Sequence, residues 1–477
     1  MSEALGIDEH DLKAQNPRFL LRQPRALQWF EHGRLVKRHD EERQAGRFEL
    51  FLDLLYVAIL SNFADFLAED ISGAKLVKYI VSYPPYTQSS VPIMRQLTAI
   101  CLQLVLAPSW HIWSDIRELM NSFYNDDLLQ RLLILWLMAV LVVYGNNAPL
   151  VDEDIGAMRA AVGSYMVARV TSNLAHLVFS FASYHHRRQQ RLWFVLSTIC
   201  LCIYIPLYFE DISFRGKIAA AAVAVSLEEI TWIFCYSPAA KKLLHVKYST
   251  AVDIAHEIDR FAAFYIIVLG EFLYLIVKGS NAAVGFNEGL LRAIWTLIIA
   301  FCLNWLYTHA DGSMESIHPL RHNIYTAFSF AMIHLPLIAA LLAGGHVAAA
   351  SVAEEDFEDA QRWLLCEGLG VGMMCLYFFA LIHACQDEPG TLLMTKHVRI
   401  IMRPITGLIT ILLPLAHHLN ATEILSIIMA MYVACLVWET VGSLKKGACF
   451  FERWTDIDYP ETHQQEEGPK DNDAAMP

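Results

Sequence analysis

The sequence is poor in charged residues. Only 18% of its 477 residues are charged and 55% are hydrophobic, whereas about 25% charged residues are usual in soluble domains. A soluble chain of this length would be expected to divide into roughly two to four domains. The shortage of charge therefore argues against a soluble multidomain protein.

Several signatures of other protein classes are also missing. The basic residues form no clustered face of the kind that binds nucleic acid. The ten cysteines are scattered, without a Cys-x-x-Cys pair, so neither a disulfide framework nor a zinc site is expected. The glycines of "EGLGVGMM" resemble a nucleotide loop, but no strand precedes them inside their apolar run, and close helix packing is the better interpretation. No metal and no cofactor is predicted.

Apolar stretches of roughly 18 to 25 residues recur along the chain, and a stretch of that length spans a bilayer as a helix. We count about twelve, and therefore predict an all-α, polytopic transmembrane helical bundle. The predicted spans are 48–68, 91–114, 128–149, 160–183, 192–209, 217–236, 261–278, 290–307, 323–345, 363–384, 400–418 and 422–442.

The charges between the spans alternate. Segments such as "HHRRQQR" and "KKLLHVK" are rich in Lys and Arg, whereas the alternate segments are neutral or acidic. The positive-inside rule then places both termini in the cytoplasm. Residues 1–47 are polar and arginine-rich, without a visible cleavable signal peptide, and form the predicted cytoplasmic N-terminal segment. Residues 48–442 form the membrane domain, and the polar tail 443–477 is expected to be disordered.

Short similarities connect two halves of the predicted domain, 48–236 and 261–442. "RFELF" opens the first span and "RFAAF" the seventh, while "WHIWSD" and "WLYTHAD" end the spans that follow them. A separation of six spans predicts a parallel 6+6 repeat, an arrangement in which transporters form sites between halves. The alternative is that these short matches arose by chance.

Two acids in the first span are unusual. Glu49 and Asp53 lie four residues apart and share one helix face inside an apolar run. A charge in hydrocarbon costs several kcal/mol and normally faces the bundle interior. They are candidates for binding an ion or a proton, and Asp53→Asn is then expected to impair function more than folding. The alternative is a structural role at the helix start, with Arg47 or Arg131 as the partner.

Further polar residues fall deep inside other predicted spans. Arg169 and Glu271 are predicted near the midplane, either as part of a polar site or as a structural ion pair with each other. Glu228 and Glu229 lie about halfway through the sixth span. His334 lies halfway through the ninth, where it is either functional or satisfies carbonyls freed by Pro336.

Five segments, in order, resemble the low-temperature-requirement A family of polytopic membrane proteins. They are "FELFLDLLYVAIL", "SWHIWSD" with "NSFYNDDLLQRLLILWLMAVLVV", "AHEIDRFAAFYIIVLGEFLYLI", "NWLYTHADGS" and "HNIYTAFSFAMIHLPLIAALLAG". The resemblance covers roughly 48 to 385 and looks closer to fungal members. His256, Asp259, Arg260, Gly270 and Glu271 hold the positions of the family's His…acid–Arg…Gly-Glu block, and His256, Arg260 and Glu271 are candidates for binding a substrate or ion.

The chain also departs from the family pattern. The family carries a carboxylate two residues after the tyrosine, where this chain has His309, so that Asp311 is a possible substitute. Phe272 stands where the family commonly has a small hydroxyl residue. The resemblance implies a class of membrane protein and no defined activity.

Three functions fit these patterns. The first is a transporter or channel-like protein for an ion or small solute, which uses the intramembrane carboxylates. The second is a membrane-embedded acid–base enzyme, of the cyclase or isomerase type, acting on a lipid-soluble, isoprenoid-like substrate. The third is a membrane scaffold or sensor. Beyond the lipid bilayer and such a small molecule, the sequence predicts no partner, and it identifies neither the substrate nor the membrane.

Overall fold

The computed structural model describes residues 20–38, 43, 45–70, 91–125, 127–151, 154–278, 284–353, 357 and 359–448; the side chains of 65–70, 91–105 and 249 are not described. The predicted disorder of the C-terminal tail falls almost wholly outside this part of the chain. So does the first part of the predicted N-terminal segment.

Long helices make up the described chain, and one lies over each predicted span. They are α2 (Arg47–Asp70), α4 (Val91–Ser122), α5 (Leu128–Asn147), α6 (Ile155–Ala182), α7 (Arg187–Leu201) continued by η3 (Cys202–Tyr208), α8 (Phe214–Tyr236), α10 (Ile254–Lys278), α11 (Glu288–Thr308), α13 (Ile324–Ala350), α14 (Asp359–Ile382), α16 (Met402–Leu412) and α17 (Ala421–Gly442). Short helices and turns connect them: η2 (Ala148–Leu150), α9 (Pro238–Leu243), α12 (Pro319–His322), α15 (Lys396–Ile400) and η5 (Leu413–Leu415).

Nine helical segments within the described residues are long and apolar enough to cross a membrane. The helices α2, α4 and α6 also cover predicted spans but are not among these nine. Large apolar side chains point outward from the bundle, such as Leu132 and Leu135, which are 51% and 60% exposed. Such a surface suits lipid rather than water. The fold is therefore an all-helical integral membrane bundle, and twelve spans remain a prediction.

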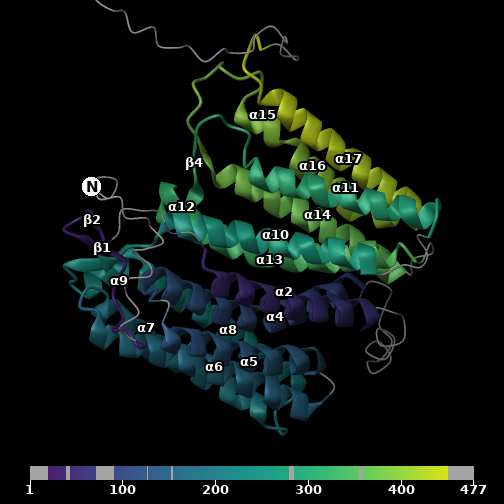
Figure 1. Ribbon diagram of the computed structural model, residues 1–477. Helices are drawn as coiled ribbons and strands as arrows, with labels where there is room; N and C mark the ends of the chain where they lie inside the picture. Colours follow the sequence, from purple (N-terminus) through teal and green to yellow (C-terminus); the bar gives the residue numbers. More distant parts are fainter. Residues whose placement is uncertain are drawn as a thin grey trace, which may run out of the picture.

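The helices run roughly side by side in two groups (Figure 1). In the first group, α5 packs on α6, α6 on α7 and α7 on α8; in the second, α13 packs on α14, α14 on α16 and α16 on α17. The groups meet where α2 packs against α10 and α13. The succession of neighbours is similar in the two groups, and the 6+6 repeat stays a prediction.

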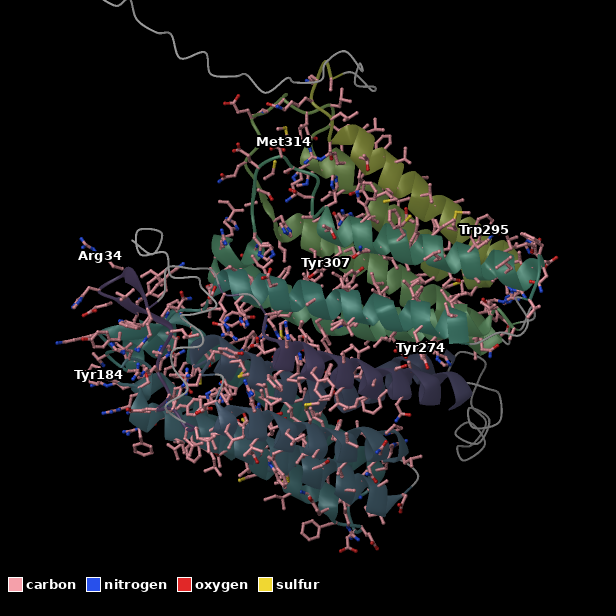
Figure 2. The ribbon with its side chains drawn as sticks, in the orientation of Figure 1. Arg34, Tyr184, Tyr274, Trp295, Tyr307 and Met314 are labelled. Carbon is pink, nitrogen blue, oxygen red and sulfur yellow. The ribbon has the colours of Figure 1, made fainter. Side chains whose placement is uncertain are left out.

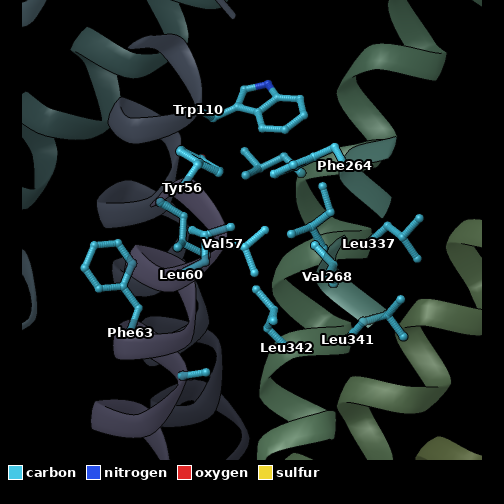
Figure 3. Close-up of a cluster of buried hydrophobic side chains, with 14 of the residues drawn as sticks. Tyr56, Val57, Leu60, Phe63, Trp110, Phe264, Val268, Leu337, Leu341 and Leu342 are labelled. Atoms are coloured by element: carbon cyan, nitrogen blue, oxygen red, sulfur yellow. The ribbon is translucent and has the colours of Figure 1, made fainter. Parts of the chain in front are cut away.

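Apolar side chains fill the junction between the two groups (Figure 3). Tyr56, Val57 and Leu60 of α2 face Phe264 and Val268 of α10 there, and each is buried. In a membrane bundle these side chains stabilise the junction by van der Waals packing rather than by withdrawal from water, because lipid is as apolar as they are.

The glycines that resemble a nucleotide loop lie inside α14, where the backbones of α13 and α14 approach closely. A Cβ added at Gly368 would lie 2.6 Å from the Ala340 carbonyl oxygen and 2.7 Å from the Gly344 Cα. Only glycine permits this separation, which is the use of small residues expected between membrane helices.

A small sheet was not foreseen in the polar N-terminal segment. β1 (Gln28–Glu31) pairs antiparallel with β2 (Arg34–Lys37), and on its other side with β3 (Tyr248–Thr250). His32 and Gly33, both at positive φ, form the two-residue turn that a hairpin of this kind requires. We call this end of the bundle the sheet end; it is the predicted cytoplasmic end. Arg34 and Tyr184 lie there, opposite Tyr274 and Trp295 (Figure 2).

Asparagine side chains begin several helices. Asn420 accepts a hydrogen bond from the Glu423 amide at 2.8 Å, and the Glu423 carboxylate accepts one from the Asn420 amide. This reciprocal capping box gives Asn420 a structural role in α17.

Candidate functional site

A buried ion-pair network joins α2, α4 and α10 at the sheet end. Asp53 is fully buried and accepts hydrogen bonds from the Arg260 Nη2 and the Trp113 Nε1, each at 2.7 Å. Glu49, one turn earlier, lies 2.8 Å from the Arg43 guanidinium and 3.2 Å from the His256 ring. We call Glu49, Asp53, His256, Arg260 and Trp113 the Asp53 network.

The Asp53 network brings together four residues singled out in the sequence. The two acids take Arg43, His256 and Arg260 as partners, rather than the Arg47 or Arg131 considered from the sequence. Arg47 is exposed at the first residue of α2, whereas Arg260 is buried in the second turn of α10. The arginines of "RFELF" and "RFAAF" therefore have different surroundings.

A second polar cluster lies between α4, α6 and α8. The Arg169 Nη1 donates to the Asp115 Oδ2 at 2.5 Å, and its Nη2 lies 3.3 Å from the Glu228 Oε1. Arg169 is the fifteenth residue of the 28-residue helix α6, near its middle. The partners are thus Asp115 and Glu228, and the alternative of an Arg169–Glu271 pair is wrong.

Histidine and tyrosine side chains complete the surroundings of Glu228. The His111 ring bridges two carboxylates: its Nδ1 lies 3.0 Å from the Glu228 Oε2 and its Nε2 lies 2.9 Å from the Glu229 Oε1. The hydroxyls of Tyr165 and Tyr204 each donate to Glu228 at 2.7 Å. We call Asp115, Arg169, His111, Glu228 and Glu229 the Glu228 cluster.

The Glu228 cluster surrounds a small cavity of about 20 Å³. Both carboxylates and cations line it, together with tryptophans; the lining is Trp110, His111, Ser114, Asp115, Arg117, Arg169, Trp193, Glu228, Glu229, Trp232, Ala331 and Met332. A cavity needs roughly 10–15 Å³ to hold one water, and a water there would find several polar partners. The site is therefore suited to a water-sized or protonic species.

A larger, apolar cavity of about 100 Å³ lies on the other side of Tyr165 and Tyr204, and we call it the outer cavity. Its walls come from α4, α5, α6, η3 and α8; they are Pro108, Tyr144, Ala148, Val151, Met158, Ala161, Val162, Tyr165, Tyr204, Leu207, Phe214, Lys217, Ile218 and Ala221. Lys217 is the charged residue of this lining. The hydrogen bonds of the two tyrosines to Glu228 therefore separate the outer cavity from the Glu228 cluster.

The other predicted site residues lie elsewhere. Glu271 is seventeen residues into the 25-residue helix α10, past its middle, and accepts a hydrogen bond from Ser61 at 2.9 Å. Asp311 is buried after α11, where it binds the Ser313 hydroxyl and lies 3.5 Å from the Lys396 ammonium. Neither residue touches the Glu228 cluster or the Asp53 network through these bonds.

His334 lies in the core of the second group. Its Nδ1 donates to the Phe330 carbonyl at 2.7 Å, and its Nε2 lies 3.0 Å from the Tyr307 hydroxyl. Pro336 has no backbone N–H, so the carbonyl that loses its helical hydrogen bond is that of Met332, four residues earlier. His334 bonds the Phe330 carbonyl, and therefore does not satisfy the carbonyl freed by Pro336.

Sequence reasoning missed an ion pair in the second group. Arg403, near the start of the predicted span 400–418, is fully buried and makes two 2.7 Å bonds to the Glu439 carboxylate. Arg403 also donates to the carbonyls of Leu376 and Ala310. The arginine thus holds α14, α16 and α17 together rather than facing water.

Sequence reasoning also missed His111 and Asp115 as site residues, because "WHIWSD" stands out there only for its similarity to "WLYTHAD". The sequence signal that could have found them is their spacing of four residues, which places both side chains on one face of α4. Among the residues that the structure describes, no group of three or more His, Cys, Asp or Glu side chains is arranged to hold a metal ion.

Comparison with known proteins agrees with the resemblance of the five segments. The family model of "Bacterial low temperature requirement A protein (LtrA)" matches residues 44–438. No curated protein and no solved structure matches the chain. The matched range contains both polar clusters and nearly all of the described helices. The chain belongs to the low temperature requirement A family.

Proposed function

We propose that this integral membrane protein is a proton-conducting transporter or channel-like protein, with the Glu228 cluster as its site. The observation that carries the proposal is the cavity inside the bundle, lined by acids and bases from α4, α6 and α8. Charged side chains placed inside a membrane bundle are expensive and mark ion or proton paths.

The bridging histidine supports a proton as the transported species. A neutral imidazole carries one N–H, so it donates to only one of two carboxylates. Both ring nitrogens of His111 lie at hydrogen-bond distance from carboxylate oxygens, on Glu228 and Glu229. When His111 gains a proton it can donate hydrogen bonds to both Glu228 and Glu229, and when it loses one it keeps the bond to only one of them. Gain of a proton from one side and loss to the other is the elementary step of a proton relay.

Proton flux into liposomes tests the proposal. Purified full-length protein would be reconstituted with a pH dye inside the vesicles, and a potassium gradient with valinomycin would supply the driving potential. We expect inward proton flux from the wild type and at least a tenfold loss in Glu228→Gln, which keeps the shape and removes the proton-carrying group. The matched control is Glu210→Gln, because Glu210 is an exposed acid paired with Arg159 on the surface.

Folding must be checked in parallel, since Glu228 is buried. A second variant, Glu229→Gln, changes a more accessible acid, 18% exposed at its side chain, and should also lower the flux. Equal flux in the wild type, empty vesicles and both variants, with monodisperse protein, would refute the proposal. In that event the enzyme and scaffold interpretations take its place.

A further inference from the structure

Lys217 is a buried cation without an assigned role. It lies in the second turn of α8, whose N-cap is Ser213, and is 7% exposed. No hydrogen bond or ion pair joins its ammonium to any residue in the described part of the chain. Burial of an ammonium without a partner costs several kcal/mol.

The position of Lys217 on its helix offers no compensation. The N-terminal turns of a helix carry partial positive charge, so a lysine there is less favourable than an acid. The exposed acid Glu210, in the preceding turn, lies against Arg159 instead. Neither the helix dipole nor the nearby acid Glu210 therefore stabilises the positive charge of Lys217.

Lys217 is also the cation of the outer cavity. Eleven residues separate Lys217 from Glu228 on α8, which corresponds to about 16 Å along the helix. The cavity therefore has a cationic end at Lys217 and a far end at Tyr165 and Tyr204, whose hydroxyls are engaged with Glu228. Between these ends the walls are apolar.

We propose that the outer cavity binds a small monocarboxylate, with its carboxylate at Lys217 and its alkyl chain directed toward Tyr165 and Tyr204. A single ammonium matches a single negative charge, whereas a phosphate ester commonly engages several donors. The volume of about 100 Å³ sets the length of the chain. A cavity of about 150 Å³ accommodates the six carbons of benzene, so a chain of about four carbons fits here.

The proposal is independent of proton transport, because its readout is binding at equilibrium. The test uses full-length protein in lipid nanodiscs and butyrate as the probe, with butanamide as the uncharged molecule of equal length. Calorimetry or ligand-observed NMR would give both affinities. We expect the wild type to bind butyrate at least tenfold more tightly than butanamide.

Substitutions test whether the preference for the carboxylate over the amide arises at the outer cavity. Lys217→Met should remove the tenfold preference, while Lys217→Arg, which keeps the charge, should retain it. Arg215→Gln is the matched control, since Arg215 is an exposed cation two residues away on the same helix, and it should bind like the wild type. Ala221→Leu narrows the cavity and should weaken binding of both molecules.

Three outcomes would overturn the proposal. They are equal affinity of the wild type for butyrate and butanamide, an unchanged preference in Lys217→Met, and tighter binding of butyl phosphate than of butyrate. If Lys217→Met fails to fold, Lys217→Arg and Ala221→Leu still decide, because the proposal requires the first to bind like the wild type and the second to bind more weakly.

Discussion

Removal of the Asp53 carboxylate should destabilise the protein strongly. Asp53 and Arg260 are both fully buried, and their bond of 2.7 Å joins α2 to α10. In Asp53→Asn the guanidinium of Arg260 keeps its charge, because arginine does not release its proton in proteins. Two of its nitrogens, Nε and Nη1, already have no hydrogen-bond partner. Loss of one partner of a buried pair costs about 3–5 kcal/mol.

The reverse substitution should cost less. In Arg260→Met the side chain keeps much of its volume, and the Asp53 carboxyl can take up a proton instead of staying charged. The double variant, Asp53→Asn with Arg260→Met, removes the unpaired cation and should be more stable than Asp53→Asn alone. This order reverses the expectation from the sequence that Asp53→Asn affects function more than folding.

Unfolding by SDS titration in mixed micelles measures these differences in the free energy of unfolding. Glu210→Gln is the control, since it breaks the exposed Arg159–Glu210 pair at 3.1 Å and should change stability by only about 0–1 kcal/mol. The reasoning fails if Asp53→Asn unfolds within about 1 kcal/mol of this control, or if the double variant is less stable than Asp53→Asn alone.

Two further predictions concern stability. Gly368→Ala should destabilise the protein by about 1–3 kcal/mol, because the added Cβ would lie 2.6 Å from the Ala340 carbonyl oxygen. Gly270→Ala is the control in the same SDS titration. It lies on an exposed helix face, where an added Cβ has nothing within 4 Å, and should be neutral or slightly stabilising. Burial lowers the pKa of His186 to about 4, although the ring donates to the Gln28 carbonyl at 3.2 Å. The unfolded chain binds that proton near pH 6.5, so this contribution to stability is complete above about pH 6.5 and is lost progressively toward pH 4, by about 3 kcal/mol. His186→Asn should flatten the decline in unfolding temperature over that range; an unchanged slope would contradict the assignment.

Composition and apolar length were enough to predict the helical membrane class. The burial of Glu49 and Asp53 was also predictable, because two acids on one face of an apolar helix must point inward. Their partners were not, since Arg260 lies 207 residues from Asp53 along the chain. Only the packing of α2 against α10 brings these side chains together.

Charge patterns misled where a residue near a helix end is buried. Arg403 stands near the start of the predicted span 400–418, where a cation is expected at the membrane surface, yet the structure places it 0% exposed against Glu439. Similarly, Asp115 lies at the end of an aromatic cluster and looks interfacial, although α4 continues to Ser122 and carries it inside. Helix ends set the depth of such residues, and sequence periodicity places helix ends only to within a few residues.

The β1–β3 pairing has a consequence for biogenesis. Trp29 pairs with Thr250, so the strand closes a loop of about 220 residues that contains the first six predicted spans. At a synthesis rate of about 5–20 residues per second, roughly 10–45 s pass between the synthesis of β1 and that of its partner strand β3. The β1–β3 pairing therefore cannot form until the last helix of the first group has been made. Its closure would mark the completion of that group before the second group is inserted.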